Sequence, residues 1–208
     1  MVMFKCQMCG VCCRASHIAV LAHEKLILMR LAKTLGINVK FSYDYTIYDR
    51  YSDQQIVLTY YIVLENGSCP FLKGNVCSIH NLYKPLICRS FPYVPKKVEY
   101  LYNTDLKIIK HRSIYAISTA CTFIRKFKSE IERQIVSEND IKSFLPDEYL
   151  AATKMEILRT KYLTALSYLW RANYVSLDFT YKGRTHVIDA YSFIRRYLPY
   201  FVIDYRVY

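Results

Sequence analysis

Cysteines carry most of the chemistry that this sequence could perform, and they are grouped along the chain. One group reads Cys-x-x-Cys-Gly-x-Cys-Cys-Arg from Cys6 to Arg14, and a second runs from Cys69 through Cys77 to Cys88. Thiolates are the soft ligands that bind zinc and iron–sulfur clusters, and a Cys-x-x-Cys turn places two sulfurs toward one ion. Two such groups are more specific than a single pair. The sequence therefore predicts a metal centre.

Every cysteine of the chain is a candidate ligand, and the full set is Cys6, Cys9, Cys12, Cys13, Cys69, Cys77, Cys88 and Cys121. The weakest candidate is Cys121, since an isolated cysteine also packs well as a small buried hydrophobe. The side chains of neighbouring Cys12 and Cys13 are expected to point in different directions, so that only one of them binds a given ion. Four thiolates suffice for one zinc or one [4Fe–4S] cluster. Eight cysteines thus predict either two ion sites or one site with spare thiols.

Other residues near the cysteines have predicted supporting roles. His80 follows Cys77 at a spacing that suits zinc, but with so many thiols a hydrogen-bonded structural histidine is expected. Phe91 and Pro92 are expected to pack over the site and exclude water. Cationic side chains beside a thiolate-bound cluster would offset its negative charge. The candidates for this role are Lys5, Arg14, Lys73 and Arg89.

Length and composition set limits on the class of protein. The chain has 208 residues, 53% of them hydrophobic, which suffices for a buried core and argues against a disordered chain. Its longest uncharged run, residues 113–124, is too short to span a bilayer as a helix. Without a recognisable secretory signal, we expect a soluble cytoplasmic protein, where a reducing environment favours metal binding over disulfides. No catalytic triad, carboxylate pair or glycine-rich nucleotide loop is recognisable.

The net charge of +12 indicates a basic surface. Such a surface can bind RNA, DNA or an acidic protein, so a protein or nucleic-acid partner is one prediction. Tyrosines next to basic residues, in 181–184 and 195–197, could stack on bases and neutralise phosphates. A basic RNA-binding or ribonucleoprotein-binding module stabilised by the metal therefore stays open as an alternative, and the oligomeric state is not predicted.

Hydrophobic patterns predict the elements that position these groups. A strand over 17–21 is expected to lead into a helix over 22–35, which Gly36 ends. Residues 43–53 read as a loop, and residues 55–64 as a strand that ends at the turn signal Asn66–Gly67. Further along, the sequence predicts a hairpin around 103–105, helices over 123–136, 146–172 and 188–198, and a strand over 175–181. The predicted fold class is α+β. Its two parts are an irregular cysteine-rich metal-binding domain with short strands and helices (1–121) and a mostly helical C-terminal extension (122–208).

The order and spacing of the cysteine motifs, including Cys69-Pro-Phe-Leu and Cys88-Arg-x-Phe-Pro, resemble the YkgJ-type cysteine-cluster family, whose domain is described as zinc- or iron-chelating. The resemblance covers about residues 4–95 and extends to Cys121 at most, because a later cysteine of the family often precedes Pro-Gly and Cys121 precedes Thr122–Phe123. Flagellin lysine methylases are similar through the same signature and are associated with a [4Fe–4S] cluster. The resemblance thus favours an iron–sulfur cluster over zinc, and it implies an S-adenosylmethionine-dependent protein lysine methylase as an alternative function.

Overall fold

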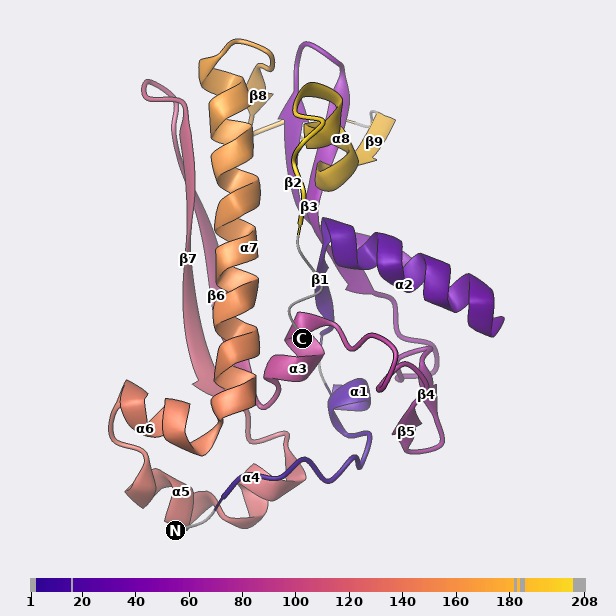
Figure 1. Cartoon of the computed structure of the whole chain (residues 1–208), viewed down its shortest axis with the longest axis vertical. Helices are drawn as coiled ribbons and strands as arrows, with labels where there is room; N and C mark the ends of the chain where they lie inside the picture. Colours follow the sequence, from indigo (N-terminus) through magenta and orange to yellow (C-terminus); the bar gives the residue numbers. More distant parts are fainter. Residues whose placement is uncertain (1–2, 16, 182, 184–185, 204–208) are drawn as a thin grey trace.

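Two arms rise from a cysteine-rich base in the computed structural model (Figure 1), which describes residues 3–15, 17–181, 183 and 186–203. The helices are α1 (Cys12–Ala15), α2 (Ala22–Leu35), α3 (Leu86–Ser90), α4 (Thr122–Lys126), α5 (Lys128–Gln134), α6 (Glu138–Phe144), α7 (Pro146–Arg171) and α8 (Ala190–Tyr197). The strands are β1 (Ala19–Leu21), β2 (Phe41–Asp49), β3 (Gln54–Ile62), β4 (Leu72–Lys73), β5 (Val76–Cys77), β6 (Tyr93–Asn103), β7 (Ile108–Ile117), β8 (Leu177–Asp178) and β9 (His186–Asp189). The predicted α+β class is confirmed.

The first arm is a sheet in the order β1-β3-β2-β8, with β9 added in parallel beside β3. Strand β3 is central and carries an unbroken buried run over 56–60, as expected for a strand covered on both faces. Helices α2 and α8 pack against it. Helix α2 has the bounds that the sequence predicted, and Gly36 ends it in the left-handed conformation with φ of 64°.

The prediction of a loop over 43–53 was wrong, because most of this segment is strand β2. It pairs antiparallel with β3, and the register shifts between Tyr43 and Thr46. The outward face of β2 is polar and aromatic, so the segment lacks the alternation of apolar and polar residues that predicts a strand. Tyr45 stacks on Tyr100 of the other arm, with ring centroids 3.6 Å apart, so a contact between the arms fixes this segment.

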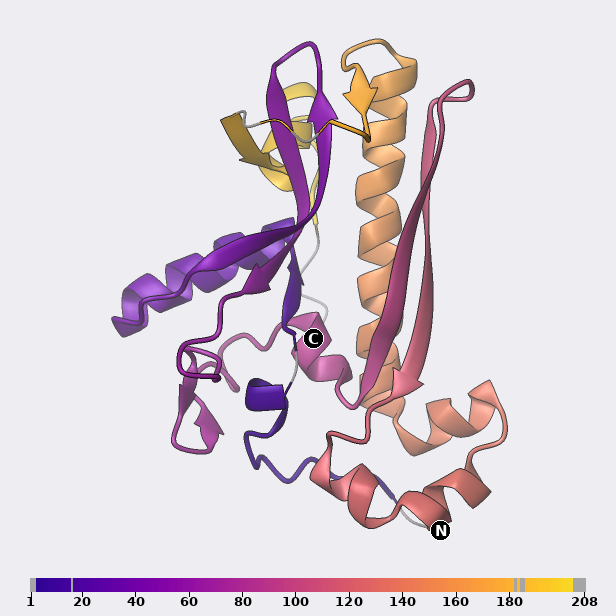
Figure 2. The ribbon, with the colours of Figure 1, turned by 180° about the vertical axis from the view of Figure 1, so that it is seen from behind.

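The second arm consists of the hairpin β6–β7 lying along α7, an arrangement that both views show (Figures 1 and 2). The predicted hairpin is present and longer than expected. Helix α7 begins at Pro146, followed by two acidic residues that suit the positive end of a helix dipole. Below it, the predicted helix over 123–136 is divided into α4 and α5. The predicted strand over 175–181 shortens to the two residues of β8.

The main apolar core joins both arms to the base and contains buried residues from Cys13 to Ile203. A smaller cluster lies at the foot of α7, where Phe4 of the N-terminal segment packs edge-on against Phe123, with ring centroids 5.4 Å apart. The proposed boundary near residue 121 stays a prediction, since core residues lie on both sides of it. Within the described residues, none of the helices combines the length and apolar character needed to cross a membrane.

Candidate metal centre

The base brings the eight cysteines together as two neighbouring sets. The first set lines a cavity of about 50 Å³. We call this cavity the five-cysteine pocket after Cys12, Cys13, Cys69, Cys77 and Cys88. The second is called the outer set and consists of Cys6, Cys9 and Cys121, which line an adjoining cavity of about 40 Å³. Cys12 and Cys88 also line this second cavity, and Cys6 lines both. The two sets therefore share a boundary.

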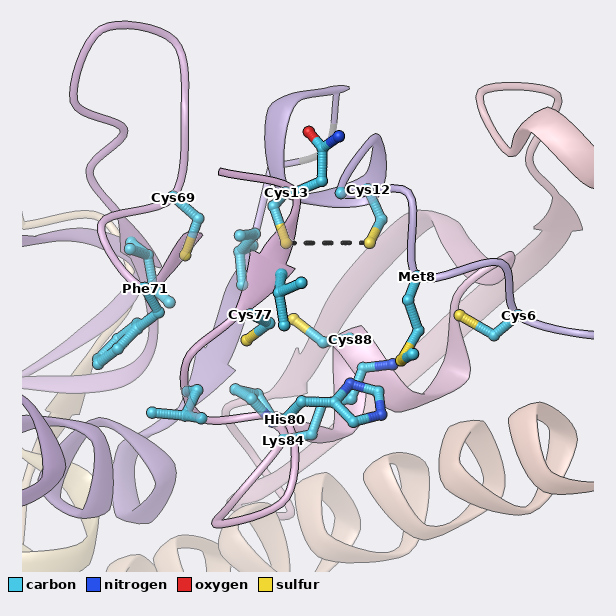
Figure 3. A pocket seen from close by; sticks show the side chains of 17 residues that line it. Cys6, Met8, Cys12, Cys13, Cys69, Phe71, Cys77, His80, Lys84 and Cys88 are labelled. Atoms are coloured by element: carbon cyan, nitrogen blue, oxygen red, sulfur yellow. Dashed lines mark hydrogen bonds between the residues drawn. The ribbon is translucent and has the colours of Figure 1, made fainter. Parts of the chain in front are cut away.

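The five-cysteine pocket draws its sulfurs from four separate segments of the chain (Figure 3). Cys12 and Cys13 come from α1, Cys69 precedes β4, Cys77 ends β5 and Cys88 lies on α3. Backbone hydrogen bonds hold these segments in place. The amide of Cys69 donates to the carbonyl of Cys13 over 2.9 Å, and the amide of Cys88 donates to the carbonyl of Pro85 over 2.9 Å. Turns rather than long elements thus position the thiols.

Gly10 lets the first loop turn tightly against the second. Its φ is +71°, and a Cβ at this position would lie 3.0 Å from both Asn75 O and Arg14 Nη1. The guanidinium of Arg14 donates to the carbonyl of Gly74 over 2.7 Å and to Asn75 Oδ1 over 3.0 Å. Arg14 therefore joins the N-terminal loop to the β4–β5 turn instead of lying over the sulfurs.

The expectation that Cys12 and Cys13 point in different directions was wrong. Their sulfurs lie 4.0 Å apart and face the same cavity (Figure 3). The hydrogen bond from Cys13, aided by the charge of Lys84, lowers the pKa of the Cys12 thiol to about 6, while the same hydrogen bond raises the pKa of the Cys13 thiol. Both residues belong to the short helix α1, and both line the five-cysteine pocket.

Burial keeps the other thiols of the pocket in their neutral form. It raises the pKa of the Cys69 thiol to about 11 and raises the pKa of the Cys88 thiol well above its ordinary value. Backbone amides oppose this effect, since that of Phe71 donates to Cys69 and that of Ile79 donates to Cys77. Amide donors of this kind favour a thiolate ligand once a cation supplies the compensating charge. The pocket is thus chemically suited to a metal that displaces the thiol protons.

Lys84 is the cation that sequence reasoning missed. Its side chain lines both cysteine cavities, and its charge lowers the pKa values of the thiols of Cys12, Cys77 and Cys88. The four cations expected in this role do not line either cavity. The sequence signal was the position of Lys84 between Cys77 and Cys88, inside the second motif. His80 also lines the five-cysteine pocket, so its imidazole lies beside the space in which an ion would bind.

The outer set ties the N-terminal loop to the start of α4. Cys9 Sγ lies 3.5 Å from Thr122 Oγ1, and that hydroxyl donates to Gln7 Oε1 over 3.1 Å. The amides of Phe123 and Ile124 donate toward Cys121, whose thiol pKa burial nevertheless raises. Cys121 therefore faces the other thiols rather than packing only as a hydrophobe. Phe91 lines the same cavity and covers it, as its predicted packing role requires.

The thiols converge on the two cavities without surrounding a single point. Among the described residues, no three His, Cys, Asp or Glu side chains are already placed as the ligands of a single ion. Binding therefore requires side-chain rotation of the cysteines toward the centre of a pocket, which staggered rotamers permit. The donor set itself fits a thiophilic metal, since each pocket offers at least three thiols.

The basic runs considered for nucleic-acid binding are only partly within the described structure. Lys182 and Arg184 lie outside the described residues. Arg195 lies 5.7 Å from the ring centre of Tyr191, and Arg196 donates to Gln54 Oε1 over 2.7 Å. Both arginines of the second run thus pack on the fold, and a nucleic-acid partner stays a prediction.

Comparison with known proteins gives one match. The protein-family model described as "CxxCxxCC: Putative zinc- or iron-chelating domain" matches residues 5–122, which is more than half of the chain. The matched range contains all eight cysteines, together with Lys84 and the whole lining of the five-cysteine pocket. Neither the curated proteins nor the solved structures gave a match.

Proposed function

Since the chain belongs to the family of zinc- or iron-chelating CxxCxxCC domains, we propose that it carries a cysteine-bound iron–sulfur cluster in the five-cysteine pocket. The cluster holds the irregular loops of the base in place. One observation supports this proposal above the others: the five cysteines of the pocket and Cys6 all line one cavity that Lys84 also lines. Chelation of zinc or iron is the property of the family, and the cluster is the finer assignment proposed here.

The ligand set favours a cluster over a single zinc ion. One tetrahedral zinc needs four ligands, whereas six thiols, counting that of Cys6, and His80 line this cavity. A [4Fe–4S] cluster spreads four cysteine ligands over the corners of a larger body. Its net negative charge also needs nearby cations and amide donors, which Lys84 and the amides of Phe71 and Ile79 supply.

The outer set supports a second metal site beside the cluster. Three thiols leave one coordination position open, which is the arrangement of metal sites that exchange a ligand. Cys12 lines both cavities, so its sulfur can complete either set. We infer that the outer set binds its metal more weakly than the five-cysteine pocket, because Cys6 is exposed.

Anaerobic purification tests the proposal directly. A visible absorption spectrum is recorded, and iron, zinc and acid-labile sulfide are measured on the same sample. A brown protein with about four irons and four sulfides is the expected result. A colourless protein with stoichiometric zinc would replace the cluster by a zinc site. A protein without metal, whether its thiols are free or paired, would overturn the proposal.

Two cysteine variants separate the two sets. Cys69→Ser is expected to lose the cluster and its colour, while Cys121→Ser keeps the cluster because Cys121 lines the outer cavity and not the five-cysteine pocket. Iron and sulfide per chain are measured for both variants beside the unchanged protein. Loss of the cluster from Cys121→Ser, with retention in Cys69→Ser, would reverse the assignment of the two sets.

A further inference from the structure

A larger cavity, of about 500 Å³, lies beside the metal centre and shares a wall with it. Cys12 and Cys88 line both this space and the five-cysteine pocket. Most of its remaining lining comes from β1, β2 and β3 on one side and from β6 and α7 on the other, with Ile87 of α3 and Phe91 from the base, so it lies between the two arms seen in Figure 1. We call it the interarm cavity. Its volume is that of a typical small-molecule site.

A buried cation forms part of this cavity. Arg159 of α7 is only 3% exposed, yet it carries a permanent charge. Its Nη1 donates to Glu156 and, over 3.3 Å, to Ser113 Oγ. Its Nε is also buried, and among the described residues it has no hydrogen-bond acceptor. Buried polar groups are nearly always paired, so an unpaired guanidinium donor in the wall of a cavity points to a missing acceptor that a ligand would supply.

Further charges at the cavity favour an anion. Lys96 and Lys97 of β6 line it, although Lys97 is engaged with Glu99 at 2.6 Å. The carboxylate that lines it is that of Asp44, which accepts a hydrogen bond from Thr59 over 2.8 Å. Lys97 is paired with Glu99 and Arg159 with Glu156, so the groups that can meet an anion are Lys96 and the unpaired Nε of Arg159. A ligand with its own negative charge would engage both groups.

The rest of the lining is flat and apolar. Tyr45 and Tyr100 stack at an interplanar angle of 12° and bridge the two arms at the cavity. Aliphatic and aromatic side chains from both arms complete the wall, among them Ile18, Ile87, Phe91, Val94, Val98 and Met155. Such walls bind planar, weakly polar bodies, and the few polar groups set the orientation.

We propose that the interarm cavity binds a small organic carboxylate with a planar apolar body, and that Arg159 anchors its carboxylate. The planar fork of a guanidinium matches the two oxygens of a carboxylate as well as those of a phosphate, and the apolar walls favour the anion of smaller charge. The bound molecule lies against Cys12 and Cys88, so it touches the wall of the metal centre. The proposal goes beyond metal binding and does not depend on which metal is present.

Benzoate is the probe, with benzylamine as a cation of the same size and shape. Titrations at neutral pH into the metal-loaded protein are followed by calorimetry and by amide chemical shifts. Benzoate is expected to saturate one site and to shift amides on β1, β6 and the Arg159 turn of α7, while benzylamine does not bind. Metal content is measured on the same sample, so failure of this proposal is separate from failure of the metal assignment. Equal binding of both compounds, or no saturable benzoate binding, would overturn it.

Variants locate the site. Arg159→Lys keeps the charge but removes the fork, and it is expected to weaken benzoate binding by about tenfold or more. Because Arg159 is buried, Lys96→Ala tests the same site without touching the core, and about a threefold loss is expected from an exposed charge. Lys110→Ala on β7 is the matched control, since Lys110 is exposed and does not line the cavity. An equal effect of Lys96→Ala and Lys110→Ala would show non-specific charge attraction and would count against the site.

Discussion

The base and the arms of this protein are organised by different means. In the arms, β3 and α7 are regular elements whose buried apolar residues form one continuous core. In the base, the segments that carry the cysteines are short turns, held by backbone hydrogen bonds and by contacts such as that of Arg14 with Gly74. Phe71 and Leu86 of the base are buried in the same core, but the cysteine turns have no long helix or strand to order them. A bound metal would hold these turns together.

The arms and the base also differ in how their ionisable groups are stabilised. In the arms, buried charges are paired within the protein, as Arg159 is with Glu156. In the base, the thiols of Cys69 and Cys88 are neutral because burial raises their pKa values. The arms therefore need no metal to pair their buried charges, whereas the base becomes electrostatically complete when a cation binds.

Removal of the metal should have the largest effect, and it should destabilise the base more than the arms. Structural metal sites contribute on the order of 10 kcal/mol to folding, so chelation should expose the amides of residues 69–88 to hydrogen exchange. The amides of α7 and β3 should keep most of their protection. Hydrogen exchange followed by mass spectrometry, before and after chelation, measures both regions at once. Equal loss of protection in both regions would show that the arms also depend on the metal.

A single methyl group at Gly10 should loosen the base. Gly10→Ala combines a positive φ with a Cβ 3.0 Å from a backbone oxygen, and a loss of about 3 kcal/mol is expected. Gly74→Ala is the matched control, because its φ is +60° but nothing lies within 4 Å of its Cβ; about 1 kcal/mol is expected there. Urea unfolding of the metal-loaded variants gives both values. Similar losses would mean that the loops do not pack as closely as described.

His23 should make the arms sensitive to acid. Burial, and then the charge of Lys154, lowers its pKa from 6.5 to about 3. The folded state thus keeps a neutral imidazole while the unfolded chain takes up a proton below pH 6.5. The stabilisation is present above that pH and falls by about 1.4 kcal/mol per pH unit as the pH drops toward 3.

Urea unfolding between pH 6.5 and about pH 5 tests this linkage, with an expected loss of about 2 kcal/mol. His23→Gln should remove that part of the pH dependence. His17→Gln is the control, because His17 is exposed. If His23→Gln retained the full slope, another group would be responsible for it.

Thr122→Val should have the smallest effect and sharpen the distinction between the cysteine sets. It removes the hydroxyl that contacts Cys9 of the outer set and donates to the nearby Gln7. Stability should fall by only about 0.5 kcal/mol, since the hydrogen bond is exposed. The metal content of the outer set should fall, while the colour of the cluster remains. Loss of the cluster's colour in this variant would show that the two sets form one site.

Strong local signals in the sequence predicted the regular elements. Helix α2 and its end at Gly36, the start of α7 at Pro146 and the turn at Asn66–Gly67 all follow from local residue preferences. Strand β2 was missed because its position depends on Tyr45 meeting Tyr100, a contact between residues far apart in the chain. Contacts of this kind leave no periodic pattern in the sequence.

The cysteines were found from spacing alone, but their partition was not. Spacing made Cys121 the weakest candidate, and only the fold places it near Cys6 and Cys9. The shared direction of Cys12 and Cys13 depends on the short helix α1, which the motif itself does not predict. The role of Lys84 likewise follows from how α3 and the preceding turn lie across the pocket.

The spread of the cysteines along the chain has a consequence for biosynthesis. A nascent chain leaves the ribosome from its N-terminus, so the last thiol of the five-cysteine pocket emerges with Cys88 and that of the outer set only with Cys121. Helix α7, which packs on α3, follows later still. The two sets therefore become complete one after the other. A metal taken up during synthesis would therefore meet a complete five-cysteine pocket before a complete outer set, and α7 would pack on α3 only afterwards.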